Sequence, residues 1–155
     1  GWAVYLAAGI GTLAGGLFSG ALIRRGVRVG VSYRYTMLAA ACLMPLSPLC
    51  ALVSSSTLAI GIASIVAFAH MTWLVTLTAT VVELYPPSLI GKAAGLIAAG
   101  SGFGGMISSE VIAWFVTHGG YRPVFFLMAV LHPIAIVLLW RTFTTRYSRP
   151  ALVAA

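Results

Sequence analysis

Residues Gly16 to Arg28 read GLFSGALIRRGVR, an apolar, glycine-rich run that ends in three arginines around a single glycine. Such a concentration of charge is unusual for this chain, because 7% of its 155 residues are charged and 61% are hydrophobic. A soluble domain usually carries about 25% charged residues. So little charge does not suit a soluble globule, whereas membrane spans need no polar coat in hydrocarbon.

On both sides of this stretch, the chain divides into apolar runs long enough to cross a bilayer. A transmembrane helix needs roughly 20 apolar residues, with a range of about 17 to 25. Five runs qualify, at residues 2–23, 35–53, 58–84, 90–116 and 124–140. They are separated by a basic segment at 24–34, small polar residues at 54–57, the pair Pro86-Pro87, and a Gly-Gly turn at 117–123. The predicted fold is all-α, a polytopic membrane helix bundle of five transmembrane helices.

The cations favour one side of this topology. If successive spans alternate in direction, Arg122 lies on one side and the other eight cations lie on the opposite side. Those eight are Arg24, Arg25, Arg28, Arg34, Lys92, Arg141, Arg146 and Arg149. Loops rich in Lys and Arg stay in the cytoplasm, so we expect a cytoplasmic C-terminus. The net charge of +7 then needs no nucleic-acid partner, and no aromatic-basic interleaving of the RNA-binding type is present.

This topology also places the first residue outside the cell, and the chain begins without methionine or a signal peptide. We therefore expect the sequence to be the C-terminal piece of a longer protein. The sequence has no nucleophile-base pair, metal-ligand cluster or phosphate loop, so we expect neither enzymatic activity nor a metal or other cofactor.

Glycines concentrate in two of the spans. The first holds two GxxxG pairs, Gly11 with Gly15 and Gly16 with Gly20. The fourth holds Gly91, Gly95, Gly100, Gly102, Gly104 and Gly105. Small residues let helices approach closely in lipid. They could equally form a surface on which helices slide during alternating access, and periodicity leaves both interpretations open.

Polar residues that could bind a substrate lie near the middle of the third span. His70, Trp73, either Thr76 or Leu77, and Thr80 follow helical spacing and share one stripe. Ionisable groups at this depth are costly and usually face a cavity or a partner. We predict substrate binding by His70, Trp73 and Thr76, with Ser101 of the fourth span as a further candidate. The alternative is packing.

The fourth span carries a carboxylate, Glu110, in its outer half. A carboxylate in an apolar helix is expensive unless it is paired or protonated. Arg122 and His118 are the candidate partners, so Glu110 is either a proton-coupling group or part of a structural ion pair.

Two stretches resemble the major facilitator superfamily. Leu6 to Gly26, LAAGIGTLAGGLFSGALIRRG, is similar to its eighth helix and following cytoplasmic loop. Ala69 to Met106, AHMTWLVTLTATVVELYPPSLIGKAAGLIAAGSGFGGM, is similar to helices ten and eleven of its anion:cation symporters, which take up sugar acids. The resemblance covers nearly the whole chain as helices eight to twelve of twelve. It implies that residues 1–155 form a partial C-terminal six-helix domain, without one helix and the N-terminal domain.

The resemblance implies a secondary active transporter of the bacterial inner membrane that imports an organic anion, a sugar acid or small carboxylate, together with protons. Its partners would be membrane lipid, the anion, protons and the N-terminal half of the same protein. The chain departs from related symporters at Gly9, where they often have an acid, and at 98–102, where they often have an amide. Two alternatives stay open: an exporter of drugs or metabolites, and a truncated membrane protein that does not transport.

The resemblance also gives the basic loop a role. The superfamily has a G-x-x-x-D-R-x-G-R-R type loop that holds the cytoplasmic gate, and a weaker copy follows helix eight. The residues that stand in this copy are Arg24, Arg25, Gly26 and Arg28. Ile23 replaces the acid of the motif, so the loop would have to borrow Glu83 from the same side. In the alternative, the arginines meet lipid phosphate, at about 1 kcal/mol each.

Overall fold

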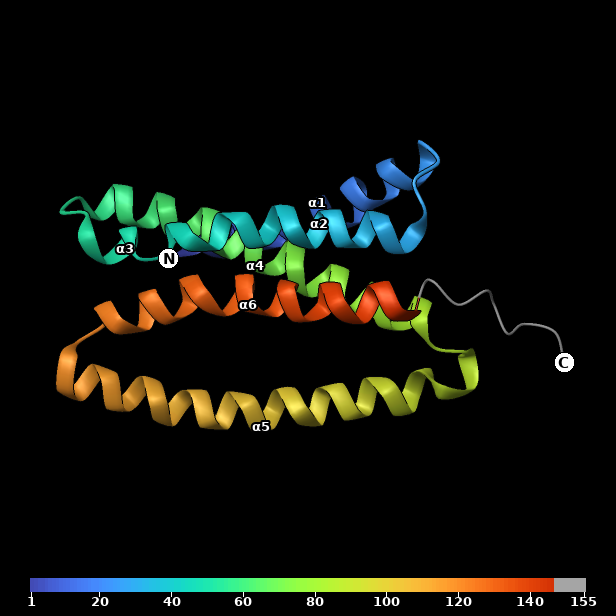
Figure 1. Cartoon of the computed structure of the whole chain (residues 1–155). Helices are drawn as coiled ribbons and strands as arrows, with labels where there is room; N and C mark the ends of the chain where they lie inside the picture. Colours follow the sequence, from blue (N-terminus) through green and yellow to red (C-terminus); the bar gives the residue numbers. More distant parts are fainter. Residues whose placement is uncertain (147–155) are drawn as a thin grey trace, which may run out of the picture.

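The structure, a computed structural model, describes residues 1–146. Those residues form helices joined by short turns, with no strand among them. The elements are α1 (Trp2–Arg24), α2 (Val29–Leu43), the 3₁₀ turn η1 (Met44–Leu46), α3 (Leu49–Leu52), α4 (Ser56–Leu84), α5 (Pro87–Gly119) and α6 (Arg122–Arg146). The segment from Val29 to Leu52 and the four remaining long helices are long and apolar enough to cross a membrane. The prediction of an all-α bundle with five such segments is confirmed (Figure 1).

The predicted second span, residues 35–53, differs from the structure at its start and in its continuity. Helix α2 begins at Val29, so the basic loop contracts to residues 25–28 and Arg34 lies inside the helix. The charge of Arg34 therefore did not indicate a loop residue. An arginine near a helix end can keep its aliphatic stem along the helix and extend its guanidinium toward the membrane interface. The segment then breaks at η1, where Pro45 and Pro48 supply no backbone N–H. The other four helices contain their predicted spans.

Two of the turns end helices as the sequence predicts. Gly26 follows α1 with φ +85°, while its N–H donates to the carbonyl of Ile23 and the N–H of Val27 donates to that of Leu22. This pair of bonds is a Schellman motif, which favours glycine at the left-handed position. Gly120 ends α5 with φ +74° and ψ −165°, a different positive-φ conformation that is essentially confined to glycine.

The tightest packing in the bundle joins α1 to α4. A Cβ at Gly11 would collide with the backbone of Phe68, and one at Gly15 would lie 2.7 Å from Cγ1 of Val75. The hydroxyl of Thr72 crosses the same interface and donates to the Gly11 carbonyl at 2.8 Å. The first GxxxG pair is therefore a close-packing surface. A Cβ added at Gly16, in contrast, would meet no atom within 4 Å, so this glycine does not pack against another helix among residues 1–146.

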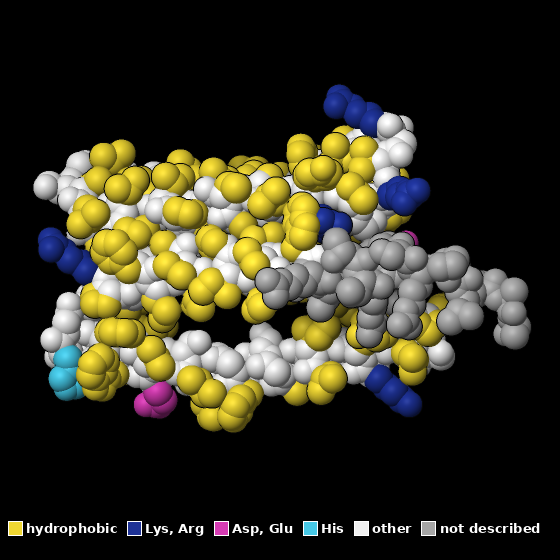
Figure 2. All heavy atoms as spheres, viewed as in Figure 1, with side chains coloured by type: hydrophobic (Ala, Val, Ile, Leu, Met, Phe, Trp, Pro, Cys, Tyr) yellow, Lys and Arg dark blue, Asp and Glu magenta, His cyan; other side chains and the backbone are white. Residues whose placement is uncertain are grey.

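Helix α5 stands apart from the other helices (Figure 1). None of its residues is buried, and an open slot separates its middle from the rest of the bundle (Figure 2). An added Cβ would meet nothing within 4 Å at Gly91, Gly95, Gly100, Gly102, Gly104 and Gly105. The small-residue face of this span thus has no packing partner among residues 1–146.

The side chains are distributed as in a bundle surrounded by lipid. Large apolar side chains such as Leu17 and Leu96 point outward, with exposures of 67% and 77%. Much of the interior is small and polar instead, and includes Ser19, Ser32 and Thr36. The Ser32 hydroxyl donates to the Ser19 carbonyl at 2.7 Å and so joins α2 to α1. Interfaces of small residues and interhelical hydrogen bonds are typical of helix association in membranes.

Candidate functional site

Two histidines from different helices meet at the middle of the bundle. His70 is the central residue of α4, and His132 lies close to the centre of α6. Nδ1 of His70 lies 3.2 Å from Nε2 of His132, which is hydrogen-bond distance. The rings meet edge to face with centroids 5.3 Å apart, and Trp73 packs edge to face on His132 at 5.5 Å. When both imidazoles are neutral, one donates and the other accepts.

The two histidines reach each other from the faces that α4 and α6 turn toward one another. On α4, the neighbouring side, which includes Ala69, Thr72 and Thr76, is buried, while His70 lies at the edge of that buried side and is exposed. On α6, Pro133 follows His132 inside the helix and contributes no backbone N–H. In the sequence, His132 and Pro133 predict only a kink in the last span. The signal that could have identified His132 as a site residue is its position as an ionisable residue in the middle of an apolar span.

Trp73 and Thr76 occupy the interior of the bundle. Trp73 is 6% exposed and packs in a core cluster with Met37, Ala40, Ala41 and Ile136. Thr76 is 2% exposed, and its hydroxyl donates to the Thr72 carbonyl at 2.7 Å. These contacts are those of the packing alternative, and substrate contact by either side chain stays a prediction.

The candidates on α5 do not join the histidine pair. Ser101 and Glu110 are both exposed. Among the side chains described, no ion pair links Glu110 to Arg122 or His118. His118 instead places Nδ1 2.9 Å from the Trp114 carbonyl and stacks on the Trp114 ring at 4.9 Å. The roles predicted for Ser101 and Glu110 therefore remain predictions.

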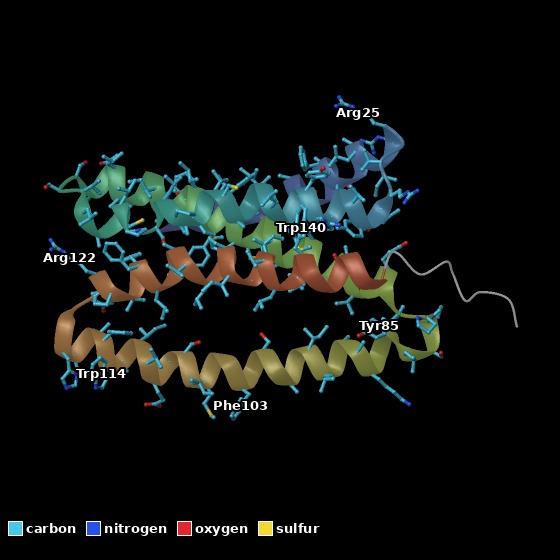
Figure 3. All side chains as sticks on the ribbon, in the orientation of Figure 1. Arg25, Tyr85, Phe103, Trp114, Arg122 and Trp140 are labelled. Atoms are coloured by element: carbon cyan, nitrogen blue, oxygen red, sulfur yellow. The ribbon has the colours of Figure 1, made fainter. Side chains whose placement is uncertain are left out.

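The cations gather at one end of the bundle, as the alternating topology predicts (Figure 2). Arg25 lies at that end and Arg122 at the opposite end (Figure 3). Arg24, Arg25 and Arg28 are exposed, and none forms an ion pair with Glu83 in the part of the chain that the structure describes. The side chains of Arg141 and Arg146 and all of Arg149 lie outside that part.

These features define a polytopic membrane protein: five apolar segments of membrane length, an interior rich in small and polar side chains, and cations gathered at one end. No group of three or more His, Cys, Asp or Glu within residues 1–146 could hold a metal ion. The family model of the Major Facilitator Superfamily matches residues 1–154, and the chain belongs to this superfamily of membrane transporters. A comparison with curated proteins gives no match.

Proposed function

We propose that the chain is the C-terminal part of a proton-coupled transporter that imports an organic anion, a sugar acid or small carboxylate, by alternating access. The observation that supports this proposal best is the hydrogen-bonded pair His70–His132 at mid-depth. Histidine is the side chain whose unperturbed titration falls closest to physiological pH. The pair therefore places two adjoining imidazoles, one from α4 and one from α6, where a transported proton could bind.

A second imidazole makes protonation at this depth less costly. A lone charge in hydrocarbon is expensive, but a protonated His70 can donate to neutral His132, or the reverse, in a charge-assisted hydrogen bond. Two protons would place like charges on rings 5.3 Å apart, which disfavours double protonation. The pair thus suits uptake of a single proton.

The direction of coupling follows from charge. Each elementary charge that crosses the membrane is worth about 2.3 kcal/mol per 100 mV, and the negative interior opposes entry of an anion. Protons that enter with the anion offset this opposition. No Lys or Arg lies beside the histidine pair among the described side chains, so we place the main cationic partner of the anion in the N-terminal half.

The test is uptake by the complete transporter in proteoliposomes, with radiolabelled sugar acids and small carboxylates and an acid pulse outside. We expect acid to stimulate uptake of at least one carboxylate. His70→Gln and His132→Gln should abolish the stimulation, whereas the control His118→Gln, at the exposed outer turn, should keep it. The absence of stimulation for every carboxylate would exclude symport. Proton-driven efflux would instead support the exporter, and no transport at all would support the non-transporting alternative.

A further inference from the structure

An apolar groove lies between α2 and α6, in the half of the bundle that carries the arginine loop. It has a volume of about 380 Å³ and is lined by Leu38, Ile136, Val137 and Trp140. Figure 3 shows Trp140 between the two helices, toward the same end as Arg25. A water-sized group occupies about 30 Å³, so the groove has room for a stretch of about a dozen methylene groups.

One cation stands at the rim of this groove. The guanidinium carbon of Arg34 lies 3.7 Å above the centre of the Trp140 ring. Arg34 lies about one helical turn before Leu38 on α2, just as Trp140 lies one turn after Ile136 and Val137 on α6. Because the two helices run in opposite directions, Arg34 and Trp140 lie at the end of the groove nearer the arginine loop, and the aliphatic side chains continue toward the middle of the bundle.

Among the residues that the structure describes, Arg34 has no paired charge. Its Nε is buried without a hydrogen-bond partner, and no described carboxylate forms an ion pair with it. The whole chain has two acidic residues, Glu83 and Glu110, and residues 141–155 contain none. A partly buried guanidinium without a paired charge is costly, so an anion that reaches its terminal nitrogens would stabilise this site.

We propose that the groove binds an anionic phospholipid of the cytoplasmic leaflet, with its phosphate on Arg34 and one acyl chain along Leu38, Ile136 and Val137. The Trp140 ring occupies one face of the guanidinium, and because Nε is buried, the terminal Nη1 and Nη2 N–H groups are the donors for phosphate oxygens. Arginine binds phosphate through such groups, often with two parallel hydrogen bonds. Tryptophan is enriched at the membrane interface, where the phosphates lie.

The test measures quenching of Trp140 by lipids that carry bromine on their acyl chains. The complete protein in detergent is titrated with brominated phosphatidylglycerol or brominated phosphatidylcholine, and the signal of the Trp140→Phe variant is subtracted. We expect phosphatidylglycerol to quench at about tenfold lower concentration, the scale of one hydrogen bond to a charged group. Arg34→Gln should reduce this preference to about twofold or less, whereas Arg25→Gln, which removes the same charge from the exposed loop, should keep it.

A second variant tests the groove without touching the charge. Val137→Phe fills the groove from a position that is 59% exposed, and it should weaken quenching by phosphatidylglycerol about as much as Arg34→Gln does. If Arg34→Gln loses its helical circular dichroism, this variant decides the question. Equal quenching by both lipids, or equal effects of the Arg34 and Arg25 variants, would overturn the proposal. So would quenching that arises only after residues 147–155 are removed, since that segment would then be the occupant.

Discussion

The interface between α1 and α4 allows a sharp prediction from a single methyl group, Gly11→Ala. The new Cβ would lie 2.8 Å from the backbone carbon of Phe68 and closer still to its carbonyl oxygen. Backbone atoms cannot rotate away, so the two helices must separate. Overpacking of this kind costs about 1–3 kcal/mol, and separation also strains the Thr72–Gly11 hydrogen bond, a type worth about 0.6 kcal/mol in membranes. The higher helix propensity of alanine offsets about 1 kcal/mol of this cost, which leaves a net loss of about 0.6–2.6 kcal/mol.

The matched control is Gly16→Ala in the same helix, where the added methyl meets nothing within 4 Å. It should be neutral or stabilise by up to about 1 kcal/mol through helix propensity. Gly15→Ala should fall between the two, because its nearest obstacle is the side chain of Val75, which can move. The free energy of unfolding is measured by SDS titration in mixed micelles, followed by helical circular dichroism. The packing argument fails if the Gly11 variant is as stable as the Gly16 variant.

Two further predictions concern the α1–α2 hydrogen bond and the sidedness of the bundle. Ser32→Ala should lower the free energy of unfolding by about 0.6–1.7 kcal/mol, since it removes the interhelical bond to the Ser19 carbonyl; Ser64→Ala, which loses a bond only within its own helix, should change it by less in the same titration. With Cys42 and Cys50 replaced by serine, Tyr121→Cys should react with an impermeant thiol reagent on intact cells, and Val27→Cys should react only after lysis, because loops rich in arginine stay in the cytoplasm. Equal labelling of the two turns on intact cells would contradict the predicted topology.

Much of this protein follows from local chemistry, and the sequence determines that part. Five membrane-length segments follow from the length of the apolar runs. Helix ends follow from residues with special backbone requirements, as at Pro87, where α5 begins, and at Gly26 and Gly120, where φ is positive. The gathering of cations at one end follows from counting alternate loops. None of these features depends on which helix faces which.

The tertiary structure decides which residues contact one another, because the sequence of a helix surrounded by lipid does not indicate which of its faces packs against a neighbour. In a soluble helix an apolar stripe marks the buried side, but a helix that is apolar all round carries no such signal. The sequence therefore cannot say that Gly11 packs and Gly16 does not, or that Trp73 turns into the core. It cannot bring His132 to His70 across 62 residues, and it cannot place Arg34 on the ring of Trp140. Those pairings depend on how small residues let particular helices approach, which is settled only when the whole bundle packs.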